Sequence, residues 1–188
     1  MNRPFLPLAG VIATATLAAC SGMPAGPAAS AAAPFDQMAL PEPVKVPAGH
    51  RVAWETVGVG EITYECRPKA GMPGQFEWFF AGPKADLKSR NGVTVGRYWG
   101  PPATWAALDG SQFTGTQVAV APAGGGNIPL QLVKANPVSG SGELTGVAYV
   151  QRVATKGGVA PALPCTNEGL GRRETVKYQA DYIFWKPV

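Results

Sequence analysis

The chain has little charge and almost no histidine. Aspartate, glutamate, lysine and arginine make up 15% of its 188 residues, against about 25% in an ordinary soluble domain. The formal net charge of +4 is small, and the charges are spread along the chain, so the sequence predicts no nucleic-acid-binding surface. One histidine, His50, and the lack of any Cys-x-x-Cys pair argue against a metal centre. We therefore expect neither a metal nor a cofactor.

The common sequence signatures of enzymes are missing as well. The chain contains no Gly-x-Ser-x-Gly, His-Glu-x-x-His or Ser-x-x-Lys motif. The glycine run 124–126 is not followed by the Lys-Ser/Thr pair of a phosphate-binding loop. Acids such as Glu61 and Glu65 alternate with apolar residues, which indicates solvated strand faces rather than carboxylates tuned for acid–base work. No catalytic residue is predicted.

The N-terminal 20 residues are typical of a bacterial export signal. Arg3 precedes the uncharged, mostly apolar stretch 5–19, and Leu17-Ala18-Ala19-Cys20 resembles the lipobox of bacterial lipoproteins. The resemblance implies a signal peptide over residues 1–19 and a lipid on Cys20, so that the membrane is a partner through the N-terminus. The alternative is a plain signal peptide with a chance cysteine. Ser21, in place of the aspartate linked to inner-membrane retention, favours the outer membrane, facing the periplasm.

The mature chain divides into a tether and a domain. Residues 20–43 are rich in Ala, Pro and Gly and predict a disordered, lipidated tether. Beyond it, apolar and polar residues alternate over 61–67, 75–80 and 174–185, the spacing of strands with one wet face. The 24 glycines and 19 prolines supply frequent turns between such strands. We expect a single all-β domain over 44–188, an antiparallel β-sandwich or a compact barrel.

Two cysteines remain once Cys20 is assigned to lipid. Cys66 and Cys165 form an even pair in an exported chain, which favours a disulfide between them. Such a bridge would close a loop of about 100 residues, worth about 4.7 kcal/mol in the chain-entropy model. Two buried thiols are the alternative.

The segment 93–115 holds the densest group of aromatic and polar residues. Tyr98, Trp99, Trp105 and Asp109 are the candidate ligand-binding residues, because aromatic planes beside polar groups suit stacking on sugar rings or other flat ligands. The structural alternative is that both tryptophans pack in the core and that Asp109-Gly110 is a turn.

Arg152 is a second unusual residue. It falls in the same phase of the strand alternation as Leu144, Ala148 and Val150. If that face of the strand points into the core, the core contains the Arg152 guanidinium. A buried charge of this kind needs a partner. An internal salt bridge or a clamp on a backbone carbonyl is favoured over a ligand.

The order of several short motifs resembles DUF3455, a domain family of unknown function found in bacterial exported proteins and in fungi. The resemblance covers residues 60–185 and rests on Gly82–Leu87, Thr104-Trp105, Asp109–Ser111, Ile128–Leu132, Tyr149–Val153, Thr155–Gly158, Pro161, Cys165 and Tyr178–Phe184. It departs from the family at Tyr98-Trp99, where relatives have a histidine followed by an aromatic residue. The resemblance implies no established activity.

Three functions stay open at this point. The favoured one is a non-catalytic envelope protein that binds a glycan, a small molecule or an envelope protein. The second is a hydrolase-like envelope enzyme whose acids would come from Asp109, Asp181 or Glu174. The third is a purely structural envelope protein.

The lipobox generates a direct prediction. A Cys20→Ala variant has no thiol to receive lipid, so it should lose palmitate labelling and leave the membrane fraction. Labelling with palmitate and fractionation of cells check both effects. Equal membrane retention of the variant and the wild type would rule out the anchor.

Overall fold

A computed structural model describes Met1 and residues 35–188. The predicted cleavage site, Cys20 and most of the predicted tether lie outside the described residues. No helix in the described part of the chain has the length and apolar character needed to span a membrane.

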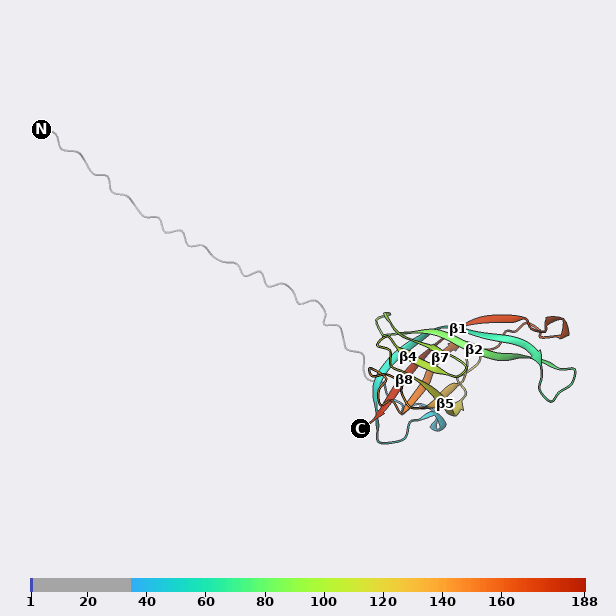
Figure 1. The fold of residues 1–188 in the computed structure, drawn as a ribbon, viewed down its shortest axis with the longest axis horizontal. Coiled ribbons are helices and arrows are strands. Elements are labelled where there is room, and N and C mark those ends of the chain that lie inside the picture. Colours follow the sequence, from blue (N-terminus) through green and yellow to red (C-terminus); the bar gives the residue numbers. More distant parts are fainter. Residues whose placement is uncertain (2–34) are drawn as a thin grey trace. The chain divides into compact units, whose positions relative to one another are not determined.

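The domain is a closed barrel of eight antiparallel strands that follow one another around the barrel in chain order, with β1 and β8 closing it (Figure 1). Of the two predicted all-β architectures, the compact barrel is therefore the one observed. The strands are β1 (His50–Pro68), β2 (Phe76–Lys88), β3 (Thr94–Trp99), β4 (Thr104–Ala107), β5 (Gln112–Ala121), β6 (Leu130–Ala135), β7 (Tyr149–Gly157) and β8 (Arg173–Pro187), with short 3-10 turns η1 (Glu42–Val44) and η2 (Asn167–Gly169).

Aromatic side chains fill the interior of the barrel. The Trp105 ring stacks on Tyr98 at 4.7 Å and on Phe113 at 5.4 Å between ring centroids, and its edge meets Tyr182. Rings of this size need small neighbours. A Cβ atom at Gly115 would come within 2.8 Å of the Trp105 ring, and one at Gly58 would overlap Tyr182. Inward glycines therefore make room for the aromatic core.

A second, smaller apolar cluster lies on the outside of the barrel, under residues 35–46, which we call the strap. Val44 and Val46 are buried there against Leu132, Ile183 and Trp185. The strap thus packs on the barrel, and the folded unit begins ahead of residue 44, where the sequence analysis had placed the domain boundary.

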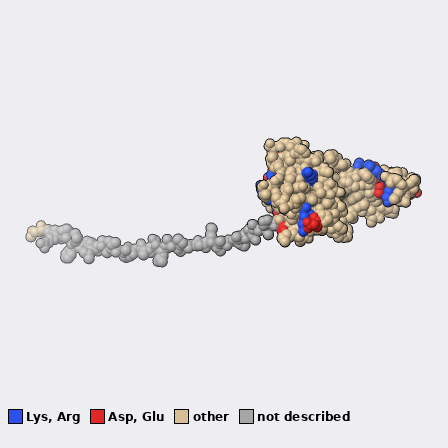
Figure 2. Space-filling model, turned by 90° about the horizontal axis from the view of Figure 1, so that it is seen from below, with Lys and Arg blue, Asp and Glu red and all other residues tan. Residues whose placement is uncertain are grey.

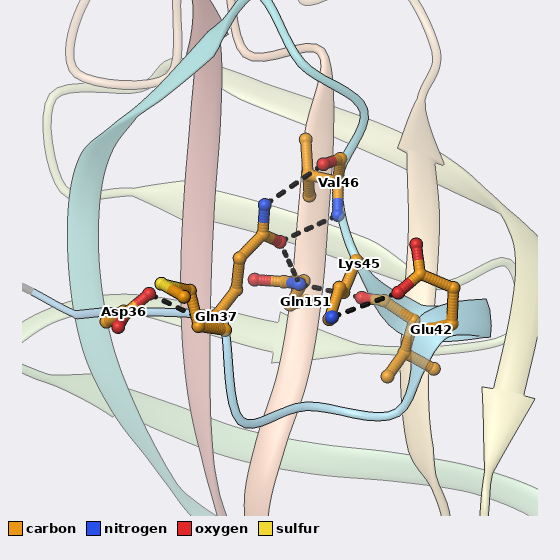
Figure 3. A network of polar contacts seen from close by, with 8 residues as sticks. Asp36, Gln37, Glu42, Lys45, Val46 and Gln151 are labelled. Atoms are coloured by element: carbon orange, nitrogen blue, oxygen red, sulfur yellow. Dashed lines mark hydrogen bonds and ion pairs between the residues drawn. The ribbon is translucent and has the colours of Figure 1, made fainter.

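Gln151 ties the strap to the barrel (Figure 3). Its side chain is fully buried. Nε2 donates to Val44 O at 2.7 Å and to Gln37 Oε1 at 3.0 Å, and Oε1 accepts from Trp185 Nε1 at 2.9 Å. Gln37 in turn bonds both backbone groups of Val46. The buried amide is therefore fully used, as a polar group in a core must be.

Three strands continue past the barrel as a ribbon, which we call the arm (Figure 1). Its strands are residues 63–68 of β1, 76–82 of β2 and 173–175 of β8, which pair only with one another. The predicted Cys66–Cys165 disulfide is present, with 5.5 Å between the Cα atoms. Together with the Trp78 Nε1 hydrogen bond to Leu163 O, it holds the β7–β8 loop on the arm.

Charged side chains are sparse on the surface. Figure 2 shows isolated basic and acidic spots separated by wide uncharged areas, with both signs side by side on the arm. On the arm, Glu65 forms ion pairs with Arg67 at 2.7 Å and with Arg173 at 3.5 Å.

The disulfide should stabilise the domain mainly by restricting the unfolded chain. It links residues 99 apart in sequence, so the Cys66→Ala/Cys165→Ala variant should lose about 2–5 kcal/mol of unfolding free energy. Chemical denaturation of the oxidised wild type, the reduced wild type and the double variant measures this. Equal stability of all three would contradict the expected role.

The Gln151 network should make this amide hard to replace. In Gln151→Leu, Trp185 Nε1 and Val44 O lose their partners inside the protein, at about 1–3 kcal/mol for each unsatisfied buried group. We expect a loss of about 2–5 kcal/mol in urea denaturation. Gln75→Leu, at an exposed position, is the matched control and should change little. A Gln151→Leu variant as stable as this control would show that the strap is not held by the amide.

Candidate functional site

The interior of the barrel opens into a cavity at the end that carries the arm. We call this cavity of about 340 Å³ the mouth pocket. One part of its wall is apolar and includes Ile62, Phe80, Val120 and Ile128. The other part carries polar groups from five strands, namely Tyr64, Tyr98, Gln117, Gln131 and Arg152. An apolar cavity with a few convergent polar groups is the usual form of a small-molecule site.

Arg152 supplies the charge of the mouth pocket. It pairs across the sheet with Gln131 on β6 and with Tyr182 on β8, whose side chain is inside the barrel, so Arg152 faces inward too. Its Nε and Nη2 donate to Pro129 O at 3.2 and 2.9 Å. Among the described residues, no carboxylate lies within ion-pair distance of it. The carbonyl clamp anticipated for this arginine is confirmed, and its positive charge is not neutralised by the barrel.

Four tyrosines surround this charge. Tyr64 OH donates to Gly158 O at 2.7 Å, and the hydroxyls of Tyr178 and Tyr182 are hydrogen-bonded at 3.2 Å. Burial raises the pKa of Tyr64, Tyr98, Tyr178 and Tyr182, and the positive charge of Arg152 opposes this rise in each case. The phenols are therefore neutral at physiological pH and keep their protons for hydrogen bonding.

A pair of amides completes the polar wall. Gln131 Nε2 donates to Gln117 Oε1 at 2.6 Å, which links β6 to β5 across the pocket. Gln131 is also the cross-strand partner of Arg152. The wall therefore presents one cation, neutral hydroxyls and neutral amides, and no acid lines the pocket.

This set of groups suits binding better than catalysis. The pocket lining contains no serine, cysteine, histidine, aspartate or glutamate. A nucleophile with an adjacent base, or a pair of carboxylates with separated pKa values, is what covalent or acid–base chemistry requires. What the pocket does offer is a positive, hydrogen-bonding side opposite an apolar side.

The four residues predicted from sequence do not form one surface. Tyr98 and Trp105 are 5% and 1% exposed and belong to the core, whereas Trp99 is 38% exposed on the outside of the barrel. The reason is the alternation of a strand: Tyr98 and Trp99 are adjacent and must point to opposite faces. Of the four, Tyr98 alone reaches the mouth pocket.

Asp109 has a structural role in a turn. Its Oδ1 accepts hydrogen bonds from the backbone N and Oγ of Ser111 at 2.9 and 2.6 Å, and its Oδ2 accepts from Glu143 N at 2.6 Å. The Ser111 hydroxyl, followed by these backbone bonds, lowers the pKa of Asp109. The carboxylate therefore joins the β4–β5 turn to the segment before β7, as the turn alternative held.

The other two acids considered for an enzyme, Asp181 and Glu174, form ion pairs at separate places on the surface. Asp181 pairs with Arg90 at 2.6 Å, and Glu174 pairs with Arg172 at 3.3 Å. Neither acid lines the mouth pocket.

Sequence reasoning missed most of the mouth pocket. Tyr64 had been assigned only to a strand face, and Gln117 and Gln131 were not singled out. The one signal was Arg152, a charge in the apolar phase of its strand. Pocket residues come from β1, β2, β3, β5, β6 and β7 and from the segments beside β4 and β6, so no local pattern joins them.

Comparison with known families agrees with the motif order seen in the sequence. The model of DUF3455, described as a protein of unknown function, matches residues 47–186. The chain belongs to this family. No curated protein and no solved structure matches it. The DUF3455 region contains β1 to β7 and all of β8 except Pro187, and so the whole mouth pocket, whereas the strap lies entirely ahead of it.

Proposed function

We propose that this protein is a non-catalytic, lipid-anchored envelope protein that binds a small anionic molecule with an apolar body in the mouth pocket. The observation that carries the proposal is Arg152, an inward-facing cation with no carboxylate partner among the described residues, at the wall of a largely apolar cavity.

An anion is the natural partner for this side chain. Pro129 O occupies Nε and Nη2, and the guanidinium has further N–H donors on Nη1 and Nη2. A carboxylate or phosphate accepts such donors in short, charge-assisted hydrogen bonds. A half-buried charge without an ionic partner is costly, and an anionic ligand would offset that cost.

The neutral groups set the rest of the selectivity. Because burial raises the pKa of the surrounding tyrosines, they add donors without adding negative charge. The apolar wall of Ile62, Phe80 and Val120 suits a ring or a branched aliphatic group. The cavity of about 340 Å³ is at the small end of ligand sites, and eight-stranded barrels have room for one small ligand.

The location of the site in the envelope is part of the same proposal. Cys20 would carry the lipid, and the strap places the start of the folded domain about 15 residues after it. A Cys66–Cys165 disulfide is compatible with an oxidising compartment. An outer-membrane anchor facing the periplasm would expose the mouth pocket to small molecules of that compartment.

Binding of phenylacetate and of its neutral amide, phenylacetamide, tests the charge requirement. The two share one apolar body, so Arg152 should favour the carboxylate. Arg152→Gln should weaken phenylacetate binding by about 10- to 150-fold, the equivalent of a hydrogen bond to a charged group. Titration calorimetry measures the affinities, within a panel of aromatic and branched aliphatic carboxylates.

Arg97→Gln is the matched control, because Arg97 is exposed on the outer face of β3. It should bind the carboxylates as the wild type does. Equal affinity for acid and amide, an unchanged affinity in Arg152→Gln, or no binding of any carboxylate in the panel would each overturn the proposed function.

A further inference from the structure

Trp99 is the most exposed tryptophan of this protein. All five tryptophans lie in the described part of the chain, and Trp99 alone, at 38%, is in the exposed class. Trp78 and Trp185 use their indole N–H groups in hydrogen bonds, and Trp105 is in the core. Trp99 is therefore the tryptophan whose ring is most accessible to a partner in solution.

Charged residues surround Trp99 in two neighbouring cross-strand rows, which we call the outer strip. In the first row, Lys177 is paired with Glu61, Glu61 with Lys84, and Lys84 with Trp99. In the second row, Val59 is paired with Asp86, and Asp86 with Arg97. The rows cross β8, β1, β2 and β3, and all these side chains are on the exposed face. Four strands at a spacing of about 4.8 Å give the strip a length of roughly 14 Å.

The charges of the outer strip are not used within the barrel. Lys84, Asp86 and Arg97 make no side-chain hydrogen bond or ion pair with any described residue, although opposite charges are neighbours across the strands. The same is true of Glu61 and Lys177. By contrast, Arg90 on the same barrel bonds both Glu55 and Asp181.

The surface is hollowed along the strip. A depression of about 680 Å³ lies beside Trp99 and Arg97, and a second one of about 400 Å³ lies beside Val59, Glu61 and Lys177. Both are bordered by Lys84, Ala85 and Asp86, so they adjoin across β2. The outer strip is therefore a continuous shallow trough with an aromatic plane at one end.

We propose that the outer strip is a carbohydrate-binding surface, separate from the mouth pocket, which takes an oligosaccharide along the trough. A sugar ring has an apolar face of C–H groups that stacks on an indole, while its hydroxyls both donate and accept hydrogen bonds. Trp99 supplies the plane, Lys84 and Arg97 supply donors, and Asp86 and Glu61 supply acceptors.

The balance of charge argues for a sugar over other partners. The strip mixes three cations with two anions, so their fields largely cancel. It therefore attracts neither polyanions nor polycations strongly, and the same holds for a charged membrane. Its alternating charges also make it unsuited to an apolar protein face, since burying unpaired charges is costly. Neutral polar hydroxyls satisfy both signs at once.

A glycan array probed with the purified full chain, followed by titration of the best-bound oligosaccharide, tests this inference. Trp99→Ala should weaken binding by about 5- to 150-fold, the range for loss of stacking on one aromatic ring. Trp99→Phe keeps an aromatic plane and should recover part of the affinity. Lys84→Ala and Asp86→Ala should each weaken binding, and a thermal melt of every variant checks folding.

Two controls separate the outer strip from other sites. Phe79→Ala removes a ring from the arm that is 45% exposed, against 38% for Trp99, and should leave glycan binding unchanged. Arg152→Gln, in the mouth pocket, should do the same, so the two proposals fail independently. The inference is overturned if no oligosaccharide on the array binds, if Trp99→Ala binds as the wild type does, or if Phe79→Ala or Arg152→Gln abolishes binding.

Discussion

Closure of the barrel through β1 and β8 is the constraint on which the other features depend. These are the two longest strands, and they are paired from His50–Pro187 to Glu65–Arg173. Closure satisfies the backbone hydrogen bonds of both edges and leaves the barrel no open edge. It also confines every second residue of every strand to a space of limited width. The size of each inward side chain therefore has to be matched to those across the barrel, as Gly58 is to Tyr182.

That confinement divides the interior into two parts. Away from the arm, the Phe184 ring packs against Trp54 and Phe113 within the apolar core cluster, which also includes Leu144. Toward the arm, the strands contribute tyrosines, glutamines and Arg152, and a cavity remains. A ligand site at the open end of a small barrel thus follows from where the aromatic packing stops.

The outer surface is divided in the same way. The strap covers the apolar outer residues of β5 to β8, including Leu132, Val153 and Ile183, which would otherwise form an exposed apolar patch. The opposite outer face, on β1, β2 and β3, carries the outer strip and no strap. The strap thus covers one side of the barrel and leaves the side with the outer strip accessible. The arm extends β1, β2 and β8 past the end of the barrel.

The sequence by itself determined the class of the fold, the pairing of the two cysteines and the family. Alternation with period two is a local property, so strands such as 174–185 could be predicted from their own residues. With Cys20 assigned to the predicted lipobox, two cysteines remained, and each had one partner. The motif order from Gly82 to Phe184 was enough for the resemblance to DUF3455, which the family model confirms.

Only the tertiary structure decided the site. Alternation shows that two faces differ but does not show which is inward, and Tyr98 and Trp99 were therefore grouped although they lie on opposite sides of the wall. Closure brings Tyr64, Gln117 and Arg152 together from strands far apart in the chain, and no spacing along the sequence encodes that meeting. Residues 35–43 of the strap were read as tether for the same reason: their few apolar side chains are packed only against the outer face of the closed barrel.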